Sequence, residues 1–374
     1  MTRRLRLLQL IGLFSLLAAG CVERPSSSTE PTVDTATNVI FLIGDGMGLT
    51  QISAGMYANG NRVAFERMPV VGLQKTYSSD NLITDSAAGA TAFSCGKKTY
   101  NGAIGVSQDT LPCPTLLERA IEQGRATGLV ASSTIVHATP AAFFGHVASR
   151  QQYEDLAVQL AASDVDFFAG GGAKYFNGRV TDQRDLVEEM RSAGREVKTY
   201  FEDPFGSHPI STALPYGYLS SLDDPLPALS GRSYLGPAAD SAISYLHAQS
   251  RKDGFFLMIE GSQIDWGGHA NDADYIVAEM IEFSDIVDAA LDYAQQEGNT
   301  LVVVTADHET GGFAINLGSR MDSIAGAFTS THHTATMVPV FAYGPGAELF
   351  AGIYENTDIH TKLAAVMKLG RAAD

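Results

Sequence analysis

Acidic side chains directly follow three of the apolar runs in this chain. Asp45 comes after NVIFLIG, Glu260 after FFLMI, and Asp307 with its neighbour His308 after LVVVTA. Removing a carboxylate from water at the end of a buried strand is costly unless the group is paired or binds a metal ion. One such residue is usually a helix cap or a turn residue. Three from separate strands, one of them beside a histidine, favour a metal site.

A further set of candidate ligands lies in the segment EGSQIDWGGHA. Asp265 and His269 are four residues apart, so on a helical turn both side chains face the same way. The two glycines between them would let the backbone fold closely around an ion. His332 and His333 precede the last apolar run. Aspartate and histidine suit zinc, whereas the oxygens of Asp, Glu and Thr side chains suit magnesium.

The candidate nucleophile is Ser86, in the segment TDSAAGATAFSCG. An alanine-rich helix is expected to begin near Ser86 and to end at Gly96. The free N–H groups and the dipole at its N-terminus would favour an alkoxide or a phosphate oxygen there. The alternative is that Ser86 only caps the helix, which is the usual role of a serine in that place.

Apolar runs typical of buried strands alternate with segments that have helical spacing. The expected strands cover residues 38–44, 128–136, 165–169, 255–259, 301–305 and 338–343. The expected helices cover residues 116–123, 182–193, 239–248, 272–296 and 358–369. This alternation predicts an α/β fold with a mostly parallel sheet, helices on both faces, and sites beyond the carboxyl ends of the strands. Residues 201–235, rich in Pro, Gly and Ser, are expected to form an irregular surface excursion.

Six segments of the chain together resemble alkaline phosphatases and occur in the same order along the sequence. They are GDGMG, TDSAAGATAFSCGKKTYNGAIGV, HATPAAFFGHVASR, EGSQIDWGGHA, TADHETGGF and HHTATMVPVFAYGPG. The resemblance extends from about residue 38 to residue 354 and is weakest around residues 175–240. It implies the three-layer sandwich of that family around a large, mostly parallel central sheet, and a homodimer. It also implies hydrolysis of small phosphate monoesters at alkaline pH through a phosphoserine intermediate.

The resemblance implies two zinc ions and one magnesium ion, with Asp45 shared between the second zinc ion and magnesium. The implied ligands are Asp265, His269 and His333 for the first zinc ion; Asp45, Asp307 and His308 for the second; and Asp45, Thr139 and Glu260 for magnesium. The family pattern does not use His332, which is therefore expected to be structural. His146, His208, His247 and His360 match no ligand position either.

The same resemblance implies roles for the residues that handle phosphate. Ser86 resembles the phosphorylated nucleophile and Arg150 the arginine that clamps the phosphate, with Asp85 orienting that arginine. Two positions near the metals depart from the family pattern: His137 stands where several members have Asp, and Trp266 where several have Lys. Both changes are expected to alter the water shell around magnesium, and with it the affinity of the third site for magnesium and the identity of the ion bound there.

The charge of the chain bears on its partners. A net charge of −17 argues against nucleic-acid binding, which needs a basic surface. An acidic protein also repels phosphate at long range, so only a locally positive site could bind it. Three divalent ions and Arg150, set against four carboxylates, would give such a site a charge of about +3.

The N-terminal residues are interpreted as a targeting segment rather than as part of the fold. Residues 1–20, with three arginines before an apolar run, are expected to be a signal peptide. Cys21 follows small residues in a pattern similar to a bacterial lipobox, which predicts a lipid anchor on the periplasmic side of a membrane. Ordinary cleavage would instead leave a secreted or soluble periplasmic protein. Residues 21–36 would then be a flexible tether and residues 37–374 the catalytic domain.

Cys95 and Cys113 are either free thiols or one disulfide bridge.

Features of the sequence argue against three other functions. A sulfatase would carry a modified residue in a C/S-x-P-x-R context, which the sequence around Ser86 lacks. Diesterase relatives generally lack the third metal site and its arginine, so Thr139, Glu260 and Arg150 favour a monoesterase. A lipid-anchored binding protein without turnover would not need a serine at the phosphate.

Overall fold

The structure, a computed structural model, describes residues 34–250 and 253–370. Within these ranges no helix is long and apolar enough to cross a membrane. The expected signal peptide, Cys21 and most of the expected tether lie outside the described residues.

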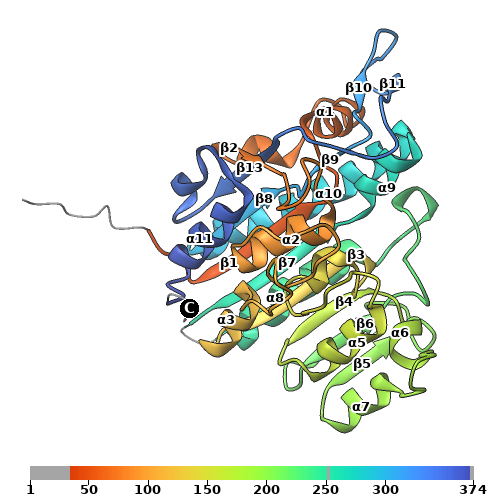
Figure 1. The fold of residues 1–374 in the computed structure, drawn as a ribbon, viewed down its shortest axis with the longest axis vertical. Coiled ribbons are helices and arrows are strands. Elements are labelled where there is room, and N and C mark those ends of the chain that lie inside the picture. The colour runs from red at the N-terminus through yellow and green to blue at the C-terminus, as the bar shows by residue number, and fades with distance from the viewer. Residues whose placement is uncertain (1–33, 251–252, 371–374) are drawn as a thin grey trace, which may run out of the picture. The chain divides into compact units, whose positions relative to one another are not determined.

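A ten-stranded sheet forms the centre of the fold (Figure 1). Its strands follow the order β14-β2-β13-β8-β1-β7-β3-β4-β6-β5, and all are parallel except β13, which runs antiparallel to both neighbours. The bounds are β1 Asn38–Gly44, β2 Val70–Lys75, β3 Ala126–Thr134, β4 Phe167–Gly171, β5 Glu196–Thr199, β6 Tyr216–Leu219, β7 Phe255–Gly261, β8 Thr300–Thr305, β13 Val338–Tyr343 and β14 Gly352–Glu355. The expected α/β fold with a mostly parallel sheet is confirmed.

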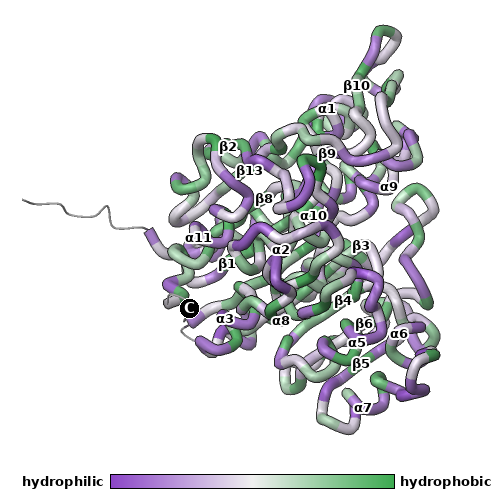
Figure 2. Tube along the Cα trace, in the orientation of Figure 1, coloured by the Kyte–Doolittle hydropathy of each residue, from purple (hydrophilic) through white to green (hydrophobic). Residues whose placement is uncertain are grey.

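Helices cover both faces of this sheet. Alternate residues of β1 pack to opposite sides: Phe41 joins the core beneath α2, α3, α5, α7 and α11, and Leu42 joins the core beneath α1, α8 and α10. Hydrophobic residues accordingly concentrate in the central strands (Figure 2). The helix bounds are α1 Leu49–Ala58, α2 Ser86–Cys95, α3 Leu116–Glu122, α4 Ala138–Ala141, α5 Tyr153–Ala162, α6 Lys174–Asn177, α7 Leu186–Ser192, α8 Leu235–Gln249, α9 Gln263–Ala270, α10 Ala273–Glu297 and α11 Asn356–Val366.

The register of the three middle strands aligns their carboxyl ends. Ile43 of β1 lies opposite Glu260 of β7 on one side and Thr305 of β8 on the other. Asp45 is therefore one residue past the end of β1, beside Glu260 and close to the turn that carries Asp307. This edge of the sheet also receives a small ribbon in which β9 (Glu309–Thr310) pairs antiparallel with β12 (His333–Thr334).

The structure corrects one expectation for the chain and decides between two alternatives that the sequence left open. Residues 201–235 are not wholly irregular, because β6 pairs with both β4 and β5 and so belongs to the central sheet. A four-residue strand, YGYL, is too short and too close to Gly and Pro to give a periodic signal. Cys95 and Cys113 form a disulfide bridge, which decides between the two alternatives left open by the sequence.

Candidate active site

Three groups of side chains converge at the carboxyl ends of the middle strands, each able to hold one metal ion. Within each group the potential ligand atoms lie within 4.8 Å of one another. The first group is Asp265, His269 and His333; the second is Asp45, Asp307 and His308; the third is Asp45, His137 and Glu260. Asp45 belongs to two groups, so the second and third are adjacent. All the Asp, Glu and His residues expected as ligands fall within these groups, and His137 joins them.

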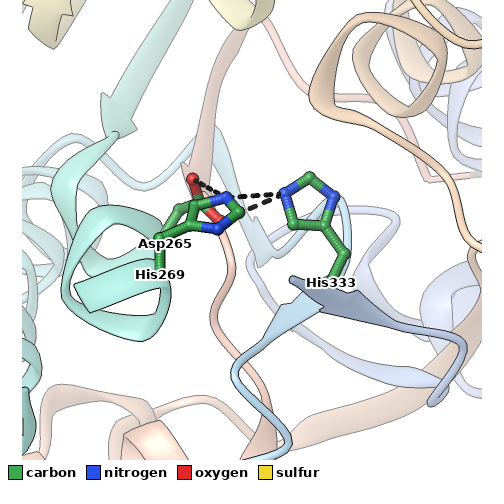
Figure 3. A group of neighbouring side chains, drawn as sticks. All are labelled: Asp265, His269 and His333. Atoms are coloured by element: carbon green, nitrogen blue, oxygen red, sulfur yellow. Dashed lines mark hydrogen bonds and ion pairs between the residues drawn. The ribbon is translucent and has the colours of Figure 1, made fainter. Parts of the chain in front are cut away.

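The first group draws its ligands from α9 and from the β9–β12 ribbon (Figure 3). The Nε2 atoms of His269 and His333 lie 3.1 Å apart and approach the Asp265 carboxylate at 3.3 and 3.4 Å. Nδ1 of His269 contacts the carbonyl of Thr331 at 2.6 Å, and Nδ1 of His333 contacts the carbonyl of Thr84 at 2.9 Å. A carbonyl can only accept, so each Nδ1 carries the proton. Both histidines also donate from Nε2 to the Asp265 carboxylate, and these hydrogen bonds raise the pKa of His269 to about 9 and raise the pKa of His333. An ion held at the centre of the group would replace the Nε2 protons and take the Nε2 lone pairs.

The second group is fully buried beside the candidate nucleophile. His308 Nε2 lies 3.1 Å from Asp307 Oδ2 and 3.5 Å from Asp45 Oδ1. The same nitrogen is 3.4 Å from the Oγ of Ser86. An ion held by this group would therefore lie next to the serine hydroxyl.

The third group combines Asp45 and Glu260 with His137. His137 directly precedes α4, and Thr139 is the second residue of that helix. Ser133 donates to Glu260 Oε2 at 3.2 Å. Nε2 of His137 lies 3.2 Å from Nη2 of Arg150. A guanidinium can only donate, so this contact uses the Nε2 lone pair and leaves the imidazole proton on Nδ1. The Trp266 ring packs edge-on against His137, with ring centroids 6.1 Å apart.

Buried oxygens in the second and third groups, and the hydroxyl of nearby Thr139, have no hydrogen-bond partners. They are both carboxylate oxygens of Asp45, Oδ2 of Asp307, Oε1 of Glu260 and the hydroxyl of Thr139. Buried polar groups in native proteins are nearly always satisfied, so a cluster of unpartnered oxygens fits ligands for a cation. Thr139 and Glu260 offer only oxygen atoms, which suit magnesium, whereas the two histidines of the first group suit zinc. The residues present therefore fit both metals.

Burial and the neighbouring charges at this edge of the sheet shift the pKa values in opposite directions. Burial, together with the charges of Asp307 and Asp265, raises the pKa of Asp45 well above its usual range. Burial raises the pKa of Glu260 to about 7. Asp265 behaves differently: its burial is outweighed by hydrogen bonds to His269 and His333, which hold its pKa well below the ordinary value. Desolvation, reinforced by Arg150, lowers the pKa of His137 to about 3, so this imidazole is neutral at neutral pH.

Ser86 is the first residue of α2, and Asp85 rather than Ser86 is the cap. The Asp85 carboxylate accepts from the backbone N–H of Ala88 at 3.0 Å. Its other oxygen accepts from Arg150 Nη1 at 3.0 Å. The alternative that Ser86 serves only as a helix cap is therefore wrong, and its hydroxyl is free to face the second group.

A cavity of about 630 Å³ opens onto these residues. Ser86, Arg150 and His269 line it, together with Trp266 and His332 at its wall. His332 is exposed and belongs to none of the three groups. His146, His208, His247 and His360 also fall outside the groups.

Comparison with known proteins identifies the family. The sequence model described as "Alkaline phosphatase" matches residues 36–203, 233–327 and 320–369. The chain is 34% identical to alkaline phosphatase 3 of Bacillus subtilis (strain 168), with 92% of both chains covered. It is 30% identical to the alkaline phosphatase of Escherichia coli (strain K12), with 92% of this chain and 88% of that one covered. The chain belongs to the alkaline phosphatase family.

Solved structures agree with this assignment. The alkaline phosphatase of the Antarctic bacterium TAB5 is 41% identical and superimposes with a TM-score of 0.83, covering 91% of this chain and 100% of that one. A variant of that enzyme, in which aspartate replaces one histidine, has Mg bound in its M3 site. The present chain is thus an alkaline phosphatase, a hydrolase of phosphate monoesters, and it contains three groups of residues that could hold metal ions.

The structure also adds residues to this alkaline phosphatase site that the sequence patterns did not single out. The Asn101 side chain accepts from the backbone N–H of Asp85 at 3.1 Å and donates to the Ile83 carbonyl at 2.9 Å. Gly102 donates to Asp85 Oδ2 at 3.0 Å, and its carbonyl accepts from the backbone N–H of Arg150 at 2.7 Å. This turn therefore holds the nucleophile loop and the arginine together. Its only sequence signal is the Asn-Gly pair within TYNG, which marks a turn without indicating what it touches.

Proposed function

We propose that this alkaline phosphatase works through a covalent phosphoserine on Ser86. The observation that carries the proposal is the Ser86 hydroxyl at the N-terminus of α2, 3.4 Å from a histidine of the second group. Ser86 Oγ would bond to phosphorus as the alcohol oxygen leaves, and water would then break the Ser86–phosphate bond and release phosphate. The free N–H groups of the first turn of α2 favour the negative charge that develops there.

Arg150 would hold the substrate phosphate during both steps. Its guanidinium already uses one donor on Asp85 and faces His137 with another, which fixes its plane at the cavity wall. The remaining N–H groups are available to two phosphate oxygens at once, a geometry that suits arginine and not lysine. Asp85 is thus the residue that orients the clamp.

The cofactors proposed are two zinc ions and one magnesium ion. Asp265, His269 and His333 would hold the first zinc ion, Asp45, Asp307 and His308 the second, and Asp45, Thr139 and Glu260 magnesium. When bound, the ions would supply positive charge that favours ionisation of the serine hydroxyl and stabilises the departing oxygen. Their charge would also make the site attractive to a phosphate dianion within a protein of net charge −17.

The third site is proposed to bind magnesium less tightly than the other two bind zinc. His137 offers an imidazole, not a carboxylate, toward Asp45 and Glu260, and imidazole is a poorer neighbour for a magnesium ion and its waters. The variant of the TAB5 enzyme, with an aspartate for a histidine and Mg in its M3 site, supports this reasoning. Zinc would compete for the site once the Nε2 lone pair of His137 is released from Arg150.

Residues 1–20 are proposed to be a signal peptide and residues 21–36 a tether, with residues 37–374 as the catalytic domain. Cys21 would be acylated and hold the enzyme at the periplasmic face of a membrane, with a secreted or soluble periplasmic form as the alternative. The resemblance to the family supports a homodimer as the assembled state.

Mass spectrometry of acid-quenched enzyme tests the covalent step. After mixing with a chromogenic phosphate monoester, a phosphate group is expected on the peptide that contains Ser86. Ser86→Ala should lose both this modification and turnover while retaining its metal content. Ser94→Ala, in the buried face of the same helix, is the matched control and should keep both. Phosphorylated peptide from the Ser86→Ala enzyme would refute the assignment.

A further inference from the structure

Thr310 lies between the first and second ligand groups and contacts both. It is fully buried in β9, two residues after His308. Its hydroxyl donates to Oδ1 of Asp265, a ligand of the first group. The same oxygen is 3.2 Å from Nδ1 of His308, a ligand of the second group. One hydroxyl thus joins the two candidate zinc sites.

The chemistry of a hydroxyl gives this contact a direction. Thr310 has one proton, and the Asp265 carboxylate can only accept, so the proton points to Asp265. The hydroxyl oxygen must then accept the Nδ1–H of His308. This leaves the lone pair of His308 Nε2 facing Asp45, Asp307 and the Ser86 hydroxyl. The orientation of one zinc ligand is therefore linked to that of another in the neighbouring site.

The backbone of Thr310 is held from three further directions. Its N–H donates to the Gly46 carbonyl at 3.2 Å, and its carbonyl accepts from Gln51 Nε2 at 2.8 Å. In the β9–β12 ribbon it pairs with His333, a third ligand of the first group. The position of this residue is therefore fixed by elements that carry ligands of both groups.

Two glycines provide the space that these contacts need. A Cβ at Gly46, where φ is +72°, would lie 2.8 Å from the Thr310 hydroxyl and 2.7 Å from the Cα of Asp265. A Cβ at Gly268 would lie 2.8 Å from the Thr310 Cβ. These distances are too short for any side chain, so the backbone around Thr310 closes tightly only because both residues are glycine.

We propose that Thr310 is a positioning residue that couples the two zinc sites, so that loading of one orients the ligands of the other. The inference rests on the proposed assignment of zinc to the first and second groups. Outer hydrogen bonds of this kind typically change metal affinity by about 10- to 100-fold when they are removed. Removing the Thr310 hydroxyl should affect both sites, although Thr310 is itself not a ligand.

Zinc titration of the metal-free full-length protein, in competition with a chromophoric chelator, tests the coupling. Thr310→Val should bind its two zinc ions about 10-fold or more weakly than the wild type, and Thr310→Ser should stay within about threefold of it. The matched control is Thr300→Val, which also removes a buried threonine hydroxyl with two hydrogen-bond partners. Thr300 is the first residue of β8, at the end of that strand away from the metal groups. Thr310→Ala, which cannot overfill the site, provides a second test if the valine variant does not fold.

The outcomes separate the coupling from the metal assignment. Zinc affinities of Thr310→Val and Thr310→Ala equal to those of Thr300→Val would overturn the coupling alone. Wild-type protein that took up no zinc would overturn the proposed centre and the coupling with it. Weakening at both sites in the valine and alanine variants, restored by serine, is the expected result.

Discussion

Replacing Arg150 by lysine should weaken phosphate binding and slow turnover without unfolding the protein. Arg150 donates from Nη1 to Asp85 at 3.0 Å and faces His137 from Nη2 at 3.2 Å, while its side chain remains 20% exposed to the cavity. A lysine would keep the positive charge but has a single nitrogen. It cannot hold Asp85 and two phosphate oxygens together, so one charge-assisted hydrogen bond to phosphate is lost.

The magnitude follows from that loss. A hydrogen bond to a charged group contributes about 1.5–3 kcal/mol, which corresponds to a decrease of about 10- to 150-fold in kcat/KM. Because the charge is retained, the decrease should stay at the level of one bond and should not approach complete inactivation. The inhibition constant for inorganic phosphate should rise by a similar factor, since product and substrate share the same oxygens.

Steady-state kinetics with a chromogenic monoester and phosphate inhibition measure both effects. Arg195→Lys is the matched control, because Arg195 is a partly buried arginine that donates to the carbonyls of Val165 and Ser163, outside the residues that line the cavity. Its variant should keep wild-type kinetics. Unchanged kcat/KM and phosphate inhibition in Arg150→Lys would mean that Arg150 does not contact phosphate.

Three further predictions concern the metal centre and the N-terminus. Burial raises the pKa of Glu260 from 4.5 to about 7, so between these pH values the metal-free native state binds a proton that the unfolded chain releases. The melting temperature of the metal-free protein should therefore fall as pH rises through this window. The metal-loaded protein should not show this fall. An equal fall with and without chelator would contradict this account. His137→Asp together with Trp266→Lys should raise magnesium affinity at fixed zinc, as measured by titration; equal affinities would show that these positions do not tune the third site. Cys21→Ser should release activity from the membrane fraction into the soluble fraction, and wild-type enzyme that is already soluble would exclude the anchor.

Sequence patterns predicted that these acidic residues gather at one edge of the sheet, because the residues follow buried strands. Asp45, Glu260 and Asp307 can be recognised locally, and the parallel arrangement of β1, β7 and β8 is enough to bring them together. Their assignment to particular metals depended on the family resemblance, since spacing alone indicates a cation without naming it.

The supporting residues could not be predicted in the same way. Thr310 and Asn101 are ordinary polar residues in the sequence, and each gains its role from partners far along the chain. Thr310 meets Asp265 across 45 residues, and Asn101 meets Asp85 across 16. Such contacts depend on the paths of a short ribbon and a turn, neither of which has a hydrophobic period. The strand β6 was missed for a related reason: four residues that include a glycine are too few to reveal alternation.

The buried carboxylates of the three ligand groups destabilise the fold when no metal ion is bound. Asp45 is completely buried with neither carboxylate oxygen hydrogen-bonded, and the nearby Asp307 and Glu260 raise its pKa further. Arg150 is the nearby cation among the described residues that opposes this effect. Without bound metal the fold must therefore keep protons on some of these carboxylates or accept repulsion between them. Divalent ions would remove that cost and reverse the local charge, so the arrangement that makes the site depend on metal is also the one that lets an acidic protein attract phosphate.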